Sequence, residues 1–323
     1  MTKVHLILIF CLLAVDSVYA ADIRLGVEVE FRTFYLNHHQ PDFSFQFQEA
    51  KLFLDTFVSE DVSALLEYDL KNAEQGSRLE RGYLLWSHLP LNTQIKLGQF
   101  RIPFGFWDVY TIDKSLNKDS LIGSDESFAP FRLRDLDIGV QLESYFRHLH
   151  LAVAVVNGNT INDFQDNNNQ KDVAARVGFT SLKFSLNLNT YVGTRSLLPQ
   201  NVSLNVPSTK HIFAVGADWI LHGEKLTLSG EVMSVRYQSV RTFGTYMQFH
   251  YDLLEVLYGL RFIGKVEFWN PNTRVPENET WQTVLGFKQT ISRGLAVQLE
   301  YRYNSRQTRE HSNGVMFEME VEL

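Results

Sequence analysis

Mixed charges gather in the longest stretch that lacks a strand pattern, about Arg101 to Asp135. Five basic and six acidic residues lie there among seven aromatic residues from Phe100 to Phe131, which is too aromatic for a disordered tail. Long loops in compact domains usually have a function, and opposite charges held across a narrow opening create a transverse field. The side chains expected at such a constriction are Arg101, Asp108, Asp113, Lys114, Lys118, Arg132, Arg134 and Asp135.

Other residues that could carry chemistry form weaker patterns. The Asn- and Asp-rich segment 157–172 offers oxygen ligands for calcium, but it lacks a regular ligand spacing, and a solvated loop explains it better. His38 and His39 form an adjacent pair that is better explained as exposed loop residues. No nucleophile elbow accompanies the remaining histidines. The sequence therefore predicts no catalytic residue, no metal site and no cofactor.

Sixteen stretches of the sequence alternate apolar and polar residues, which predicts strands. These strands would position the loops described above. The last one shows the pattern: apolar side chains at 315, 317, 319, 321 and 323 alternate with Met316 and three glutamates. Successive side chains of a strand point to opposite faces, so each stretch has one apolar and one polar face. As assigned, no stretch places Asp, Glu, Lys or Arg on its apolar face. A soluble β-sandwich also alternates, and it is the main alternative fold.

The connections between these stretches alternate in length. Tight turns, such as those near 59–61 and 292–294, alternate with connections that are mostly longer and more polar. The latter set is 37–42, 71–77, 101–135, 158–171, 195–209, 238–241, 265–279 and 305–313. An even strand number with short turns on one rim and long loops on the other is typical of outer-membrane barrels. The predicted fold is an all-β, transmembrane antiparallel barrel of about sixteen strands, with the third long loop folded into the lumen.

The N-terminal residues predict export. Lys3 precedes an apolar run from Leu6 to Val15, and Val18 to Ala20 fits a small-residue cleavage site. We therefore expect a signal peptide over 1–20, cleaved after Ala20, and one barrel domain over 21–323. The expected location is the bacterial outer membrane. Cys11 is the only cysteine and lies within the expected signal peptide, so a mature chain that begins at Ala21 has no disulfide.

The polar faces of the strands predict a charged lumen. The residues expected to line it are Arg24, Glu28, Glu30, Arg32, Lys51, Lys96, Glu143, Arg176, Arg261, Lys288, Glu300 and Arg302. Over all the stretches, the predicted inward positions carry ten basic and fifteen acidic residues. Charge rings favour the opposite ion, so this excess predicts weak selectivity or a mild preference for cations.

Several segments carry a family resemblance. The segment Gly98-Gln99-Phe100-Arg101-Ile102-Pro103-Phe104-Gly105 resembles the one that follows the fifth strand in the phosphate-selective porin O/P family. Segments 47–52, 137–141, 155–159 and 171–173 are also similar to that family, so the likeness covers the first half of the mature chain. The resemblance implies an anion-preferring pore and favours a homotrimer. The sequence departs from the family because no arginine ladder lines its predicted lumen.

The function expected from these patterns is passive diffusion of small hydrophilic solutes and ions through an outer-membrane porin. The alternatives are an anion- or phosphate-selective porin, a non-conducting structural or adhesion barrel, and an outer-membrane hydrolase. The expected partners are outer-membrane lipid and the solutes themselves. The formal charge of -7 and the lack of a basic patch argue against nucleic acid.

Overall fold

The computed structural model is a closed barrel of sixteen strands. It describes residues 23–37, 42–70, 78–105, 136–158, 170–194, 211–237, 240–253, 259–292, 294–306 and 311–322. The strands are β1 (Ile23–Asn37), β2 (Asp42–Phe57), β3 (Val62–Asp69), β4 (Arg78–Leu89), β5 (Thr93–Arg101), β6 (Leu136–Phe146), β7 (Leu149–Val156), β8 (Asp172–Thr180), β9 (Phe184–Gly193), β10 (Ile212–His222), β11 (Leu226–Tyr237), β12 (Val240–Asp252), β13 (Leu260–Asn270), β14 (Thr280–Ser292), β15 (Leu295–Arg306) and β16 (His311–Glu322). The described residues contain no apolar helix of membrane-spanning length.

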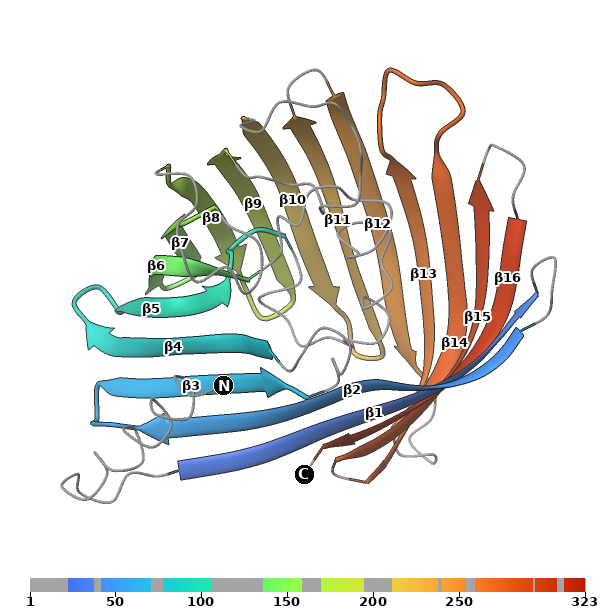
Figure 1. The fold of residues 1–323 in the computed structure, drawn as a ribbon, viewed down its shortest axis with the longest axis horizontal. Coiled ribbons are helices and arrows are strands. Elements are labelled where there is room, and N and C mark those ends of the chain that lie inside the picture. The colour runs from blue at the N-terminus through green and yellow to red at the C-terminus, as the bar shows by residue number, and fades with distance from the viewer. Residues whose placement is uncertain are drawn as a thin grey trace.

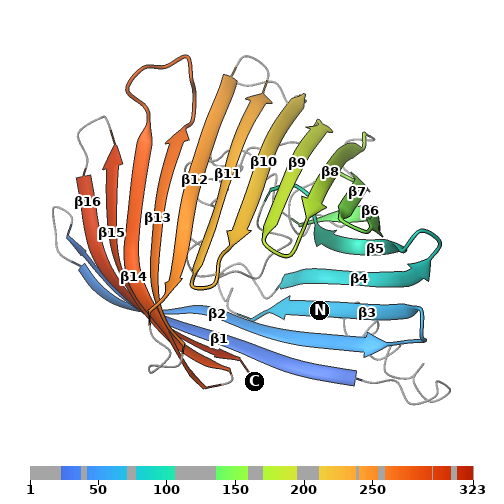
Figure 2. The same ribbon diagram turned by 180° about the vertical axis from the view of Figure 1, so that it is seen from behind.

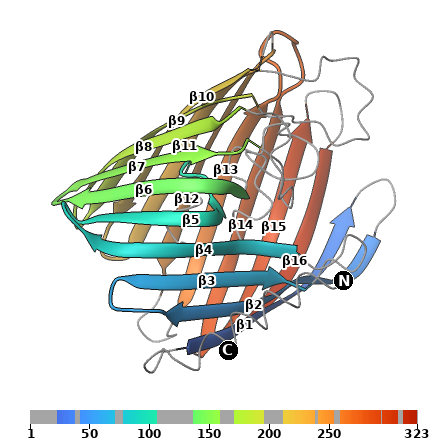
Figure 3. The ribbon, with the colours of Figure 1, turned by 60° about the vertical axis from the view of Figure 1, so that its left-hand side comes forward.

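Every strand pairs antiparallel with its neighbours in the chain, and β1 closes the barrel against β16. Figure 1 shows the strands in sequence order around the barrel, and Figure 2 shows the same order from behind. In Figure 3 the blue β1 lies beside the red β16, where the two ends of the sheet meet. Closure leaves no free sheet edge, so the ladder is continuous. The predicted all-β fold and its sixteen antiparallel strands are confirmed.

The two faces of the wall differ in burial, as the alternating sequence requires. On β7, Leu149, Leu151, Val153 and Val155 point outward and are exposed, whereas the residues between them are buried. The same alternation runs along β8 and β9. Apolar side chains therefore cover the outside of the wall, and most charged side chains of the strands lie on its inner face.

The two rims also differ. The first strand begins and the last strand ends on the rim that carries the tight turns, such as the one between β6 and β7 at Arg147 and His148. Most of the long connections lie on the opposite rim, including the one between β5 and β6. We call these two ends the turn rim and the loop rim.

One predicted strand was placed too early. The alternation of Leu254, Val256, Tyr258 and Leu260 predicted a strand there, but β13 runs over Leu260–Asn270, and residues 254–258 lie outside the described part. The expected long connection at 265–279 is therefore shorter, and begins after Asn270. Apolar alternation continues without a break into Phe262 and Val266, so the pattern predicts which side chains of this strand face outward but not where the strand begins and ends. Pairing with β12 and β14 decided those ends.

A second correction concerns the outer face. The structure extends β11 and β12 beyond the predicted stretches, and the added residues place Arg236 and Arg241 outward and exposed. The two arginines are directly opposite each other across the strand pair. The apolar face is thus free of charge along the middle of these strands but not at the loop rim.

Aromatic side chains form two rows on the outside of β12, β13 and β14. Phe243, Phe268 and Trp281 form one row toward the loop rim, with ring centroids 6.1 and 4.7 Å apart. Phe249, Phe262 and Phe287 form the other row toward the turn rim, at 5.4 and 5.3 Å. Phe249 follows Phe243 by six positions on β12, a rise of about 20 Å along the strand.

Candidate functional site: the inner wall and the segment that enters it

The segment from Gly98 to Gly105 leaves the wall at the end of β5. Gly98 has a φ of 135°, and a Cβ there would lie 2.3 Å from the carbonyl oxygen of Gly82, so only glycine fits. The next residue, Gln99, donates hydrogen bonds from Nε2 to the carbonyls of Leu79 at 2.7 Å and Glu80 at 3.0 Å. The kink and these two bonds lie where β5 stops pairing with β4, whereas its pairing with β6 continues to Arg101, after which the chain leaves the ladder.

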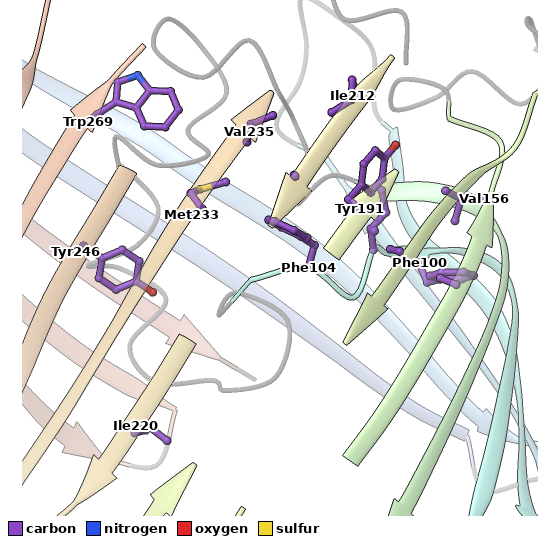
Figure 4. Packing of buried hydrophobic residues seen from close by; sticks show 14 residues of the cluster. Phe100, Phe104, Val156, Tyr191, Ile212, Ile220, Met233, Val235, Tyr246 and Trp269 are labelled. Atoms are coloured by element: carbon purple, nitrogen blue, oxygen red, sulfur yellow. The ribbon is translucent and has the colours of Figure 1, made fainter. Parts of the chain in front are cut away.

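Apolar residues of this segment pack inside the barrel. Phe100, Ile102 and Phe104 are all at most 2% exposed. The ring of Phe104, beyond the end of β5, extends to the inner face of β10. There its Cζ lies 3.5 Å from the position that a Cβ would take at Gly216. Figure 4 shows Phe104 away from β5, among side chains of β9 to β11 such as Tyr191 and Met233. A Cβ at Gly216 would be in ordinary van der Waals contact with the Phe104 ring, so only a side chain larger than that of alanine would collide with the ring.

A fully buried arginine holds the end of the segment. Arg176 of β8 donates from Nη1 to the carbonyl oxygen of Gly105 at 2.5 Å and to Oδ1 of Asn189 at 3.0 Å. Its Nη2 donates to Oδ1 of Asp218 at 2.8 Å. Asn187 and Asn189 donate to the two oxygens of Asp218 at 2.7 and 2.8 Å. Charge-assisted hydrogen bonds of this kind hold their geometry tightly, so the segment is fixed to β8, β9 and β10.

Further ion pairs follow the inner wall. Lys51 of β2 lies 3.4 Å from Glu67 and 3.1 Å from Glu80, and Arg81 also contacts Glu67. Lys96 pairs with Glu143 at 2.8 Å between β5 and β6. Other pairs on the described inner wall are Arg32–Glu318 at 2.7 Å, Arg302–Glu300 at 2.7 Å, Lys288–Glu320 at 3.5 Å and Lys265–Glu267 at 2.9 Å.

Exposure divides this wall into two parts. Most inward positions of β7 to β13 are buried, whereas β2 to β5 and β15 retain several partly exposed ones. In the second part the base is usually more exposed than its acid: 34% against 2% for Arg81 and Glu67, and 15% against 0% for Arg302 and Glu300. On the adjoining strands β14 and β16, Lys288 and Glu320 have the opposite order, at 14% and 21%. The accessible charge on this part is therefore more basic than a count of residues indicates.

The predicted lumen residues fall in different places. Glu28, Arg32, Lys51, Glu143, Arg176 and Glu300 are buried on the inner face, and Lys96, Lys288 and Arg302 are partly exposed there. Arg24 and Arg261 are exposed at the turn rim, where Arg261 Nε donates to Asp252 at 3.0 Å. Glu30 lies on β1 opposite Glu320, and its side chain is outside the described part.

The predicted constriction can be followed only at its first residue. Arg101 ends β5 and is partly buried. The others, from Asp108 to Asp135, lie outside the described residues, as do the predicted signal peptide and the pair His38 and His39. Most of the Asn- and Asp-rich segment is likewise outside. Within the described residues no group of three His, Cys, Asp or Glu is placed to hold a metal ion.

Sequence reasoning missed several inner-wall residues. The alternation near Leu254 predicts a connection over Lys265 and Glu267, which the structure places in β13. The Asn- and Asp-rich composition predicts a solvated loop that includes Asp172, whereas this residue is buried and accepts hydrogen bonds from Tyr191 and the backbone N of Thr194. Glu80 sits at a β-bulge opposite Glu67 and Tyr68, which no alternation pattern reveals. The paired glycines Gly98 and Gly105 were the available signal that the chain turns inward.

Comparison with known proteins identifies the fold. The anion-selective porin from Comamonas acidovorans superposes with a TM-score of 0.72 at 10% identity, covering 94% of this chain and 100% of that one. The outer membrane channel DcaP of Acinetobacter baumannii gives 0.64 at 13% identity, over 94% and 98%. OmpT, an outer membrane protein of Vibrio cholerae in its trimer form, gives 0.65 at 10% identity, over 94% and 100%. The chain therefore shares the fold of these proteins. No protein-family model matches the sequence, and no curated protein matches it.

Proposed function

We propose that this chain is an outer-membrane channel through which small hydrophilic solutes and ions diffuse passively. The observation that carries the proposal is the division of a closed barrel into an apolar, exposed outer face and a charged inner face. A barrel satisfies every strand hydrogen bond within itself, as lipid requires. The two aromatic rows, one toward each rim of the outer face, resemble the girdles that border a membrane-spanning band.

Several finer points belong to the same proposal. The loop rim faces the exterior and the turn rim the periplasm, since short periplasmic turns and long outer loops are usual. The N-terminal residues act as a signal peptide cleaved after Ala20. The segment from Phe100 to Gly105 begins the constriction, and residues of 106–135 complete it. The channel is a homotrimer without catalytic activity, and its likeness to a trimer form supports that assembly.

Two selectivities are supported by different observations. The excess of acidic residues in the sequence favours weak selectivity or a mild preference for cations. The greater exposure of Arg81, Lys96 and Arg302 over their acidic partners favours anions, because a buried, paired carboxylate contributes less to the field that a passing ion meets. The name of the Comamonas porin and the resemblance to the phosphate-selective porin O/P family support the second selectivity.

The deciding measurement is the reversal potential of purified protein in a planar bilayer with a potassium chloride gradient, repeated with phosphate as the anion. Steady conductance with a weak cation preference supports the general channel. A strong anion preference, with chloride current blocked by phosphate, supports the anion-selective channel. No conductance above that of a heat-unfolded control would contradict the channel and favour a structural barrel. Arg81→Gln tests the source of an anion preference, and Arg147→Gln in the turn-rim connection is its matched control.

A further inference from the structure

The outer face at the loop rim contains a hollow whose charged side chains are all arginines. Its volume is about 520 Å³, and it lies over the loop-rim ends of β10 to β13. The eight lining residues, none of them acidic, are Phe213, Val215, Ser234, Arg236, Val240, Arg241, Thr273 and Arg274. A single charge on the lipid-facing wall costs little this close to the interface. Three cations gathered in one hollow repel one another, however, so a counter-charge among them is favourable.

The strand register places two of these cations side by side, where their repulsion destabilises the strand pair. Arg236 of β11 is directly opposite Arg241 of β12, and like charges in that position destabilise a strand pair. Both side chains are exposed, and neither forms an ion pair with an acid among the residues that the structure describes. Arg241 Nε donates to Oγ of Ser234 at 3.3 Å, which orients its guanidinium and leaves both Nη groups for another acceptor.

The connection after β13 supplies the third cation. The backbone N of Thr273 donates to the carbonyl oxygen of Arg241 at 2.8 Å, so this connection is tied to the start of β12. Arg274 follows at once, is exposed, and lines the same hollow. Three guanidinium groups from β11, β12 and one connection therefore converge on a single space.

The position of the hollow indicates what occupies it. Arg241 lies two residues beyond Phe243, a member of the aromatic row near the loop rim. Such rows sit at the level of lipid headgroups. Phe213 and Val215 continue the hollow into the apolar outer face of β10, where acyl chains would lie. Arginine forks match phosphate oxygens in a bidentate manner.

We infer that Arg236, Arg241 and Arg274 form a binding site for the phosphate of an anionic lipid in the leaflet around the loop rim. The phosphate neutralises the opposed arginines, and the acyl chains lie along Phe213 and Val215. This inference rests on the proposed membrane location of the barrel but not on conduction. It differs from the inner-wall site, because these side chains point away from the lumen.

The test measures binding of phosphatidic acid to the full-length protein in a neutral detergent by native mass spectrometry. Diacylglycerol with the same acyl chains and inorganic phosphate alone are the two reference ligands. The test variant is Arg236→Gln with Arg241→Gln. Its matched control is Arg147→Gln with Lys183→Gln, which removes two exposed cations at the opposite rim.

The expected result is that phosphatidic acid binds the unaltered protein and the control variant alike, and binds the test variant at least about tenfold more weakly, the effect of losing roughly one charge-assisted bond. Diacylglycerol should bind all three weakly. Equal binding of phosphatidic acid to test and control variants would overturn the inference. So would inorganic phosphate binding as tightly as the lipid, which would indicate a free-anion site.

Two further measurements keep the result interpretable. If the double variant does not fold, Arg274→Gln in the exposed connection provides the same comparison without altering a strand. Conductance of the same preparations separates the two proposals. If the protein conducts but the arginine substitutions do not change lipid binding, only the lipid site is refuted. If the protein does not conduct but the substitutions weaken lipid binding, only the channel is refuted.

Discussion

Arginines on the two faces of the barrel wall differ in burial and in their partners. Arg176, on the inner face of β8, is fully buried, paired with Asp218 and bonded to Gly105. Arg236 and Arg241, on the outer face of β11 and β12, are exposed and lie opposite each other. The inner charge is neutralised by the protein and positions a segment. The outer charges are left for a counter-charge from the surroundings.

The difference shows that the same residue type has two roles, depending on the source of its counter-charge. A buried cation must be paired and hydrogen-bonded by the chain itself, because burying an unpaired charge is very costly. A cation at a lipid interface can obtain its partner from a headgroup. The following three substitutions test this contrast, from the largest expected effect to the smallest.

Asp218→Asn should have the largest effect, because it leaves Arg176 buried without its counter-charge. Breaking a buried pair typically costs about 3–5 kcal/mol of unfolding free energy. We expect that loss in urea unfolding of the protein in lipid vesicles, with altered single-channel conductance as Gly105 loses its anchor. The control is Arg176→Met with Asp218→Leu, which removes both charges. It should recover only part of the stability, because Asn187 and Asn189 lose their acceptor, and it should not restore the conductance. Unchanged stability in the single variant would show that the pair does not hold this wall.

Gly216→Leu should have an intermediate effect on the inner wall. A Cβ at this position already lies 3.5 Å from the Phe104 ring, so a larger side chain must displace the ring or the strand. Overpacking of this kind costs about 1–3 kcal/mol. We expect lower conductance, since the displaced segment moves further into the lumen, and recovery when Phe104→Ala is added. Additive effects of the two substitutions would contradict direct contact between them.

Arg236→Gln should have the smallest effect, and in the opposite direction. It removes a like-charge pair across the strands, worth about 0.2–1 kcal/mol. In neutral detergent we expect the unfolding free energy to rise slightly. In vesicles that contain phosphatidic acid the gain should disappear, because the lipid phosphate already neutralises the pair in the unaltered protein. The same gain in both settings, or a gain equal to that of Arg147→Gln, would remove the distinction between the two faces.

The strand pattern could be predicted from the sequence because alternation is a local property. Leu149, Leu151, Val153 and Val155 face outward in the structure as their spacing requires. The first and last residue of each strand could not be predicted in the same way, because a strand ends where its pairing partners end. The early placement of the strand near Leu254 and the two outward arginines beyond the predicted stretches both come from this cause.

The inner wall was predictable in composition but not in arrangement. The alternation predicted polar faces carrying Arg176, Lys96 and Glu143, yet it did not indicate that Arg176 binds Gly105, or that the acids are usually less exposed than their bases. Contacts of this kind join residues far apart in the chain, such as Phe104 and Gly216. No short-range pattern encodes them.

The sequence by itself determined an even number of alternating strands, because each alternating stretch can be counted along the chain. It also determined which side chains of each strand share a face, because a strand has a two-residue period. The tertiary structure decided how the strands register, which charges meet, and that three arginines gather on the outside. Register is a property of pairs of strands and closure is a property of all sixteen, so neither is contained in any one segment.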